Sequence, residues 1–472
     1  MPTHHGSRHF HRGMHAPHST FFASGKFGRL FPTLPALFHR DKTETELREA
    51  LVRLGARGGP MDPATGASNP DNPGVWAGFG FLGQFIDHDV TLDTTSSFER
   101  QNDPEGIANF RTPVLELDSV YGSGPAVSPH LYRPRTAKLL LDHEHGRDQI
   151  ARNTAGTALI GDPRNDENLI IQQLQLAFIR FHNAVVDAIE PDVNREHLFE
   201  EAQRITRWHY QWVVLHEFLP LTVGQDVVDE VYDVCAPGAG RKYFNWRHTP
   251  FIPVEFSVAA YRFGHSQIPG ALRLNGDFNG GDPVPLFDRD EVGDSDPDDC
   301  SGFGLRAPRR YVDWKHFFKT ASEDPVATKR IDPVLAEPLF DLPFEEPGPR
   351  ASLAVRNLER GHAFGLPSGQ AVACAMCLDP LAPGDLSDVA ADGFDHATPL
   401  WYYVLKEAEV VENGERLGPV GGRIVTEVLV GLLQGDRMSF VRADPKWTPA
   451  SEGIGTDADF GMTELLAFAG VA

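Results

Sequence analysis

The most concentrated group of reactive side chains lies in the segment 76–90, which is otherwise rich in Phe, Leu, Ile and Gly. Gln84, Asp87, His88 and Asp89 stand within it. If the segment is helical, Gln84 and His88 share one face and Asp87 borders that face, while Asp89 points elsewhere. A histidine beside two acids on an apolar helix indicates a cofactor pocket or a metal site. A hydrogen-bonded core histidine is the plainer alternative for this segment taken alone.

A second polar segment precedes a long apolar stretch that is expected to form a buried helix. Arg164, Glu167 and Asn168 are spaced at i, i+3 and i+4, so one helical stripe would present a guanidinium and a carboxylate to the same cavity. Asn165 or Asp166 is expected to cap this helix. The alternative is a capped, charged first turn that faces water.

Two further segments hold a histidine, an amide and two arginines. His265 follows Gly264, which leaves room for a large flat molecule to approach the backbone. Imidazole is a common neutral ligand of iron, and an acceptor on its other ring nitrogen tunes it. We expect Asn357 to be that acceptor, through its amide oxygen. Arg262 and Arg360 suit carboxylate groups.

Taken together, these segments resemble the animal-type haem peroxidase family (the peroxidase–cyclooxygenase superfamily), in a compact, bacterial-like form. The resemblance extends over roughly residues 76–367, and the order of the motifs and the spacing within each agree with the family. Each motif alone is weak, but the combination is specific. The matching motifs are Gly83–Asp89, Gly161–Glu167, Tyr261–Ser266 and the run from Asn357 to Pro367, with Phe181–Asn183 as a further match.

The resemblance implies a role for each matching residue. His88 is implied as the distal histidine, with Gln84 beside it above the iron, and Arg164 as the distal arginine. His265 is implied as the proximal iron ligand and Asn357 as its hydrogen-bond partner. Neutral His88 would carry a proton of hydrogen peroxide, first as base and then as acid. Arg164 would stabilise negative charge on the departing oxygen, and His265 would donate electron density through iron.

Further contacts with haem b are implied as well. Asp87 and Glu167 match the two carboxylates that can form ester bonds to haem methyl groups. Asn168 stands where some mammalian members carry a methionine bonded to a haem vinyl group, so we expect that third link to be absent. Arg262 and Arg360 are expected to bind the haem propionates.

The implied function is a haem peroxidase that uses hydrogen peroxide to oxidise small organic donors, halide or thiocyanate through a ferryl intermediate. One alternative is a fatty-acid dioxygenase of the same superfamily, which uses a tyrosine three residues before the proximal histidine. Arg262 holds that position here and Tyr261 lies one residue earlier, which favours a peroxidase. The other alternative is a non-enzymatic haem-binding or adhesion protein, which would need neither His88 nor Arg164.

A calcium site is indicated next to the candidate distal histidine. Residues that alternate onto one side of an extended chain supply a hydroxyl, a backbone carbonyl and carboxylates, the oxygen ligands that Ca²⁺ prefers. They are Thr112, Val114, Glu116 and Asp118. The resemblance implies a calcium ion here, tied to the histidine through Asp89. Glu116 departs from the more common Asp, and an ordinary polar-edged strand and turn is the alternative.

The chain has 472 residues and a formal net charge of −23 at pH 7, which disfavours nucleic acid and anionic membranes as partners. No apolar run is long enough for a membrane span, and the start of the sequence lacks the apolar core of a secretory signal. We therefore expect a cytoplasmic location or a leaderless export route. The sequence leaves the oligomeric state open. Leu378 rather than His follows Cys374 and Cys377, which excludes a c-type haem attachment, and the apolar run 370–378 predicts that the two cysteines pack inside a buried helix.

Helical spacing dominates the chain, so we expect a mainly α fold, with one large helical domain, few short strands and long irregular connections. Residues 1–70 are expected to form a partly irregular N-terminal arm, and residues 71–472 the haem peroxidase domain. Histidines at the start of the arm (His4, His5, His9, His11, His15 and His18) are expected to lie in a disordered tail. Helices are expected over residues 43–54, 166–189, 195–221, 365–378, 399–411 and 421–434, with an apolar segment at 254–267 and an acidic loop at 288–299.

Overall fold

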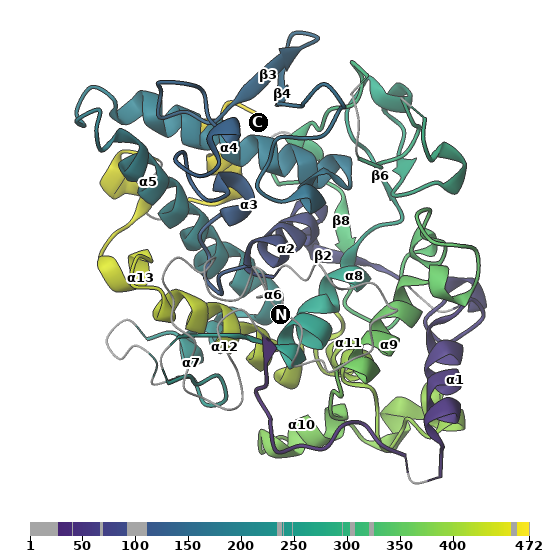
Figure 1. Cartoon of the computed structure of the whole chain (residues 1–472). Coiled ribbons are helices and arrows are strands. Elements are labelled where there is room, and N and C mark those ends of the chain that lie inside the picture. Colours follow the sequence, from purple (N-terminus) through teal and green to yellow (C-terminus); the bar gives the residue numbers. More distant parts are fainter. Residues whose placement is uncertain are drawn as a thin grey trace, which may run out of the picture.

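The structure of the protein is a computed structural model, which describes residues 27–471 except 40, 67–68, 92–110, 234–237, 239, 248, 295, 303–306, 321–324 and 455–459. Helices make up most of the regular structure, and in the described part every strand belongs to a sheet of two strands (Figure 1). The expected mainly α fold with few short strands and long irregular connections is therefore confirmed. The six histidines at the start of the arm lie outside the described residues.

The helices follow one another along the whole described chain. They are α1 Glu44–Gly55, α2 Ala77–Val90, α3 Asp118–Tyr121, α4 Leu169–Ile189, α5 Leu198–Val213, α6 Leu219–Val223, α7 Gln225–Val231, α8 Gly264–Gln267, α9 Leu353–Ala363, α10 Gly369–Ala375, α11 Leu400–Glu412, α12 Pro419–Gly435, α13 Phe440–Ala443 and α14 Met462–Phe468. The strands pair as β1 Phe27–Gly28 with β5 Ile252–Pro253, β2 Asp71–Trp76 with β8 Ala327–Lys329, β3 Leu141–Glu144 with β4 Arg147–Ile150, and β6 Ala271–Leu272 with β7 Val284–Pro285.

Helix α2 lies near the centre of the molecule and packs against α4 and α8 (Figure 1). Its first residues are small or aromatic, so neighbouring elements approach closely: a Cβ atom on Gly78 would lie 2.6 Å from the carbonyl oxygen of Phe317. Phe85 of α2 stacks on Phe178 of α4 with ring centroids 4.8 Å apart. Because aromatic packing holds α2 on several sides, the polar side chains on this helix are held in fixed directions.

Capping residues decide where the helices begin. Thr43 caps α1 in a capping box with Glu46, close to the predicted start. Helix α4 begins later than predicted, at Leu169, because the Asn168 side chain accepts a hydrogen bond from the backbone N–H of Ile171. The prediction that Asn165 or Asp166 caps this helix was therefore wrong. Residues 163–166 form a separate 3₁₀ turn, so Arg164, Glu167 and Asn168 do not form one helical stripe.

The segment 254–267 is helical but irregular. A π-helical turn at Glu255–Ala259 leads into a 3₁₀ turn at Ala260–Phe263 and then into α8. Ala259 marks the break, with φ −128° and ψ −79°. Departures from regular helix of this kind often accompany functional sites, and this one lies directly before His265.

The described part of the N-terminal segment packs on the rest of the chain. Strand β1 pairs in parallel with β5, and the buried Glu255 carboxylate accepts hydrogen bonds from the backbone N–H groups of Leu30 and Phe31 at 3.0 and 3.1 Å. Helix α1 lies against α9, and a Cβ atom on Gly55 would come within 2.7 Å of the backbone nitrogen of Val355.

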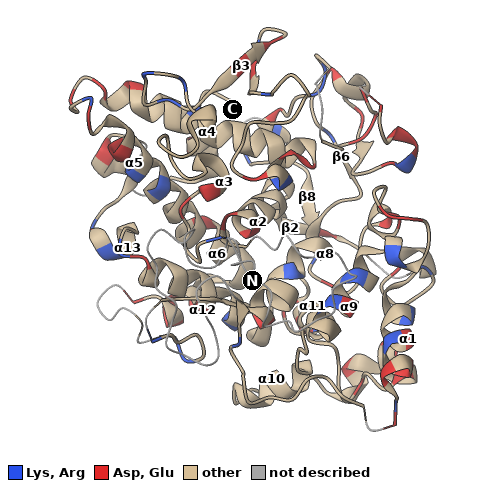
Figure 2. Cartoon of the chain, in the orientation of Figure 1, with Lys and Arg blue, Asp and Glu red and all other residues tan. Residues whose placement is uncertain are grey.

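Charged side chains gather on outer helices and loops such as α1 and α5, whereas the central helix α4 carries few (Figure 2). Among the described residues no helix combines the length and the apolar character that a membrane span requires. Cys374 and Cys377 are both exposed, so the prediction that they pack inside a helix was wrong. Helix α10 ends at Ala375, which leaves the second cysteine in the turn that follows.

Candidate active site

Helix α2 supplies the first half of the candidate site. Of its 14 residues, only Gln84 and Asp87 are not buried, and they belong to the face predicted to carry the chemistry. His88 is buried on the same helix, with 5% of its surface exposed. The Tyr261 hydroxyl donates a hydrogen bond to the Gly83 carbonyl at 3.2 Å. The segment that carries His265 is thereby joined directly to α2.

A chain of three hydrogen bonds orients the His88 ring. The ring Nδ1 lies 2.6 Å from Oδ1 of Asn165, whose Nδ2 donates to Oε1 of Gln175 at 2.8 Å. Nε2 of Gln175 then donates to the Ser119 carbonyl at 3.1 Å. A backbone carbonyl only accepts, so it fixes the orientation of both amides in turn. Asn165 therefore presents an acceptor, His88 carries its proton on Nδ1, and Nε2 keeps its lone pair.

The His88 ring is neutral at physiological pH. Burial, followed by the nearby Arg164 guanidinium, lowers the pKa of His88 to about 4. A neutral imidazole with a free Nε2 can accept a proton. Sequence reasoning assigned no role of this kind to Asn165 or Gln175. The available signal was Gln175 itself, a polar residue in an apolar helix that needs a buried partner.

Arg164 lies beside His88, where it was predicted, and a buried carboxylate holds it. Its guanidinium donates to both Asp162 oxygens, at 3.1 and 2.8 Å, and to the backbone carbonyls of His88 and Thr91. Arg111 binds the same carboxylate at 2.6 Å. Burial raises the pKa of Asp162, but the two arginines outweigh burial and hold it below its usual range. Asp162, which was not predicted, therefore fixes the arginine in place.

Glu167 completes this side of the site. The Gln84 side-chain amide donates a hydrogen bond to Glu167, so residues from two separate motifs meet. Burial raises the pKa of Glu167 to about 7, although Arg164 opposes the shift. Asp87 lies one helical turn before Thr91, whose hydroxyl donates to the Asp87 carboxylate at 3.1 Å. Both carboxylates are close enough to Arg164 to raise its pKa.

His265 and Asn357 are in contact, as predicted. The amide nitrogen of Asn357 lies 2.7 Å from Nδ1 of His265, and its oxygen accepts from Arg262 at 2.8 Å. The predicted contact through the amide oxygen is therefore wrong for this structure. The physical reason is that a guanidinium only donates, so Arg262 takes the oxygen and turns the amide nitrogen toward the imidazole.

Burial and the Arg262 charge lower the pKa of His265 to about 3, although the ring keeps partial exposure. Arg360 lies one turn after Asn357 on α9, with its guanidinium carbon 5.1 Å from the centre of the Phe364 ring. Tyr261 is buried and stacks on Phe256 with ring centroids 4.6 Å apart.

Of the residues predicted to bind calcium, Asp118 is the one that contacts Asp89. Oδ1 of Asp89 accepts from the Asp118 backbone N–H at 2.8 Å. Burial and then the Asp118 charge raise the pKa of Asp89 to about 7. In the described part, Oδ2 of Asp89 and the Thr112 hydroxyl are buried without a hydrogen-bond partner. Glu116 is 8% exposed and Val114 is half-buried. However, no cluster of three His, Cys, Asp or Glu side chains suited to a metal occurs among the described residues.

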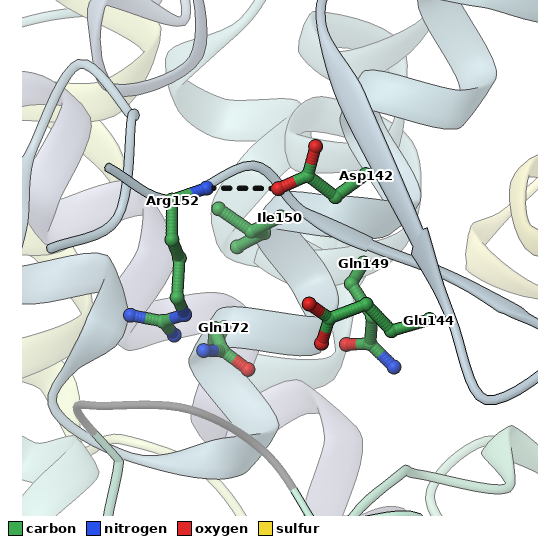
Figure 3. A pocket seen from close by; sticks show the side chains of 6 residues that line it. All are labelled: Asp142, Glu144, Gln149, Ile150, Arg152 and Gln172. Carbon is green, nitrogen blue, oxygen red and sulfur yellow. Dashed lines mark hydrogen bonds between the residues drawn. The ribbon is translucent and has the colours of Figure 1, made fainter. Parts of the chain in front are cut away.

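A separate pocket lies between the β3–β4 hairpin and α4 (Figure 3). It contains none of the predicted site residues. It borders the candidate site through Asp166, which accepts from Gln172 at 2.6 Å and from Arg152 at 2.7 and 2.6 Å. These bonds hold the Arg152 guanidinium on Asp166, and none of the residues that line the pocket contacts His88.

Comparison with known proteins identifies the family. The family model for animal haem peroxidases matches residues 93–378, a range that includes Arg164, Glu167, His265 and Asn357 and begins after His88. Chorion peroxidase of Drosophila melanogaster is 27% identical over 272 residues, which cover 54% of this chain and 32% of that protein. Thyroid peroxidase of Mus musculus is 26% identical over 374 residues, covering 71% of this chain and 39% of that protein. The chain thus spans about a third of the first of these relatives.

Solved structures show the same fold. Peroxidase A from Dictyostelium discoideum matches with a TM-score of 0.63 at 16% identity, covering 92% of this chain and 94% of that one. A fatty acid alpha-dioxygenase from Arabidopsis thaliana matches with a TM-score of 0.59 at 16% identity, covering 93% of this chain and 77% of that one. Likeness at this identity establishes the fold, and the family-model match covers more than half of the chain. The chain belongs to the animal haem peroxidase family.

Proposed function

We propose that the protein is a haem peroxidase that uses hydrogen peroxide to oxidise small organic donors, halide or thiocyanate. The observation that carries this proposal is the His88 ring, held neutral with its Nδ1 proton bound to Asn165 and its Nε2 therefore unprotonated. Peroxide cleavage requires a base that takes a proton from one oxygen and returns it to the other.

The residues of the candidate site fit a haem group. Four half-buried side chains come from α2 and from two segments that each pack against it: Gln84, Asp87, Glu167 and His265. His265 offers an imidazole for the iron, and Arg262 and Arg360 offer charges for the propionates. Asp87 and Glu167 offer carboxylates for ester bonds. When bound, haem b supplies the oxidising chemistry that protein side chains lack.

The chain's own residues would handle the protons of peroxide. His88 would take a proton on Nε2 and return it to the departing oxygen. Arg164 stays cationic because Asp162 raises its pKa against the effect of burial, so it would stabilise negative charge on that oxygen. Asp162 and Asn165 would act as positioning residues, because each holds one of these two side chains.

Iron binding would change the contacts on the proximal side. A neutral imidazole that binds a metal through Nε2 carries its proton on Nδ1 and needs an acceptor there. In this structure the Asn357 oxygen is occupied by Arg262. We infer that Arg262 leaves Asn357 for a propionate when haem binds, which frees the amide oxygen for His265.

We also propose that calcium binds at Asp89. Two buried oxygens without a hydrogen-bond partner in the described part, on Asp89 and Thr112, support this proposal because buried polar atoms normally have one. Burial, followed by the Asp118 charge, raises the pKa of Asp89, and a bound cation would offset the repulsion between the two carboxylates.

The fatty-acid dioxygenase alternative is less well supported. The fold is shared with such enzymes. However, Tyr261 is packed between Phe256 and Phe263, and its hydroxyl is directed to the Gly83 carbonyl. The residue three positions before His265 is Arg262, which binds Asn357.

Stopped-flow absorption of the haem-loaded protein tests the proposal. The Soret band should change within milliseconds of adding one equivalent of hydrogen peroxide and recover when a phenol is added. His88→Ala should lose the fast change while keeping a normal haem content. A Soret band that peroxide leaves unchanged in the wild-type protein, or an unchanged rate in His88→Ala, would refute it. Oxygen uptake with linoleate would instead favour the dioxygenase.

A further inference from the structure

A pair of exposed cysteines lies far along the chain from the candidate haem residues of α2. Among the described residues, Cys374 and Cys377 are exposed free thiols, whereas Cys300 is buried. Burial raises the pKa of the Cys300 thiol above its usual range, so that residue is poorly suited to thiolate chemistry. The exposed pair is therefore where a soluble oxidant meets thiols in the described part of the chain.

The end of α10 brings the two cysteines into one turn. The backbone N–H of Cys377 donates to the Cys374 carbonyl at 3.0 Å, and that of Leu378 donates to the Ala373 carbonyl at 2.9 Å. These two bonds form a Schellman motif. A turn closed in this way keeps its end Cα atoms within about 7 Å, which overlaps the roughly 4.4–6.8 Å that a disulfide spans. The separation of the two Cα atoms in this turn is thus compatible with a disulfide between the two cysteines.

The position of Cys377 is unusual. It has φ +58°, in the left-handed region that this position of the motif usually fills with glycine. A cysteine in this conformation is less favourable than a glycine, because its Cβ atom disfavours positive φ. Backbone departures of this kind are a reason to look for a function of the side chain.

Neighbouring tyrosines hold both sides of the turn. The Tyr243 hydroxyl donates to the Met376 carbonyl at 2.8 Å, between the two cysteines. The backbone N–H of Leu381 donates to the Tyr403 hydroxyl at 3.0 Å. A Cβ atom on Gly369, at the start of α10, would lie 1.9 Å from the Tyr403 ring, so the helix is pressed against that ring. The turn therefore keeps its shape while its sulfur atoms stay open to solvent.

We propose that Cys374 and Cys377 form a peroxide-sensitive dithiol that closes to an intrachain disulfide. One thiolate attacks a peroxide oxygen, the O–O bond breaks, and the released hydroxide takes a proton to become water. The second thiol then attacks the resulting sulfenic acid, the S–S bond forms, the S–O bond breaks, and a second water leaves. The dithiol loses two electrons and two protons, and peroxide accepts both. Haem takes no part in this reaction.

Peptide mass spectrometry after alkylation tests the proposal. Trypsin places both cysteines in one peptide, residues 361–406, which contains no other cysteine. After peroxide treatment of the full chain, this peptide should carry no alkyl group and weigh less by two hydrogen atoms. Dithiothreitol should restore both alkylation sites. The haem-loaded and haem-free chains are both measured, since haem consumes peroxide, and closure in either supports the proposal.

Three variants serve as controls. Cys377→Ser and Cys374→Ser should each halt at a sulfenic acid on the remaining cysteine, which dimedone captures. Cys377→Gly removes the thiol but suits the left-handed position, so it should raise the melting temperature while abolishing closure. The variant therefore separates loss of the thiol from damage to the turn.

Two results would overturn the proposal. One is that no disulfide forms after a large excess of peroxide, either because both thiols still react with the alkylating reagent or because each is oxidised separately to sulfinic acid. The other is that the disulfide forms as fast in the urea-unfolded chain as in the native chain. The native turn holds the two cysteines together and should therefore accelerate disulfide formation severalfold. Neither result depends on haem turnover, so the peroxidase proposal stands or falls separately.

Discussion

Replacing Asn165 with leucine tests whether Asn165 keeps the His88 proton on Nδ1. Asn165 is fully buried, and its oxygen, 2.6 Å from Nδ1 of His88, is the acceptor that keeps the proton on that nitrogen. Leucine has a similar size but offers no acceptor. The Nδ1 proton would then be buried without a partner, which costs about 1–3 kcal/mol. The ring can avoid this cost by moving the proton to Nε2 or by rotating.

Either response removes the free lone pair from the site. Since about 1.4 kcal/mol corresponds to a factor of ten, a penalty of about 1–3 kcal/mol predicts a roughly 5- to 150-fold slower reaction with peroxide. The assay is the second-order rate constant for the peroxide-induced Soret change, measured by stopped flow at pH 7. Haem content should not change, because Asn165 contacts His88 and Gln175 and is not among the residues proposed to hold haem.

Two companion variants make the test specific. Asn165→Asp keeps an acceptor for Nδ1 and should retain a rate within about tenfold of wild type. Gln175→Leu removes the two outer bonds of the chain but keeps the Asn165 side chain, so Asn165 can still bind His88 and the loss should be smaller than in Asn165→Leu. If Asn165→Leu reacts with peroxide at the wild-type rate with haem fully bound, then the hydrogen bonds through Asn165 do not set the His88 tautomer that peroxide cleavage uses.

Four further predictions concern His88 and three other parts of the structure. Because the pKa of His88 is about 4 and the base must be neutral, the rate constant for peroxide should be level from pH 7 to about pH 5, fall to half near pH 4, and vanish below. Acid–acetone should extract haem from Asp87→Asn, Glu167→Gln double-variant protein but not from wild-type protein after turnover; full extraction from both would rule out the esters. Asp89→Asn should abolish binding of Ca²⁺ measured by calorimetry, and wild-type protein that binds none would refute the calcium site. Glu427→Gln should lower the free energy of unfolding in urea by about 2–4 kcal/mol, because the buried carboxylate accepts three backbone N–H bonds and an Arg423 bond, whereas an unchanged midpoint would contradict this.

The sequence by itself determined the fold class, the family and the candidate haem residues. Helical spacing predicted α1 and α4 nearly at their observed bounds, because a long apolar face can be buried in few other ways. The four motifs identified four candidate site residues: His88, Arg164, His265 and Asn357. Polar residues in apolar segments need a hydrogen-bond partner or have a function. The contact between His265 and Asn357, 92 residues apart, was predicted in this way.

Only the tertiary structure decided how these residues are held. Asn168 rather than Asn165 caps α4, because a cap depends on which side chain reaches the free N–H groups. Asn165 was thereby left to bind His88 and Gln175. Spacing along a chain indicates which residues share a face of one helix. It cannot indicate which donor will reach which acceptor when separate segments meet, and such choices fix the tautomer of His88 and the orientation of Asn357.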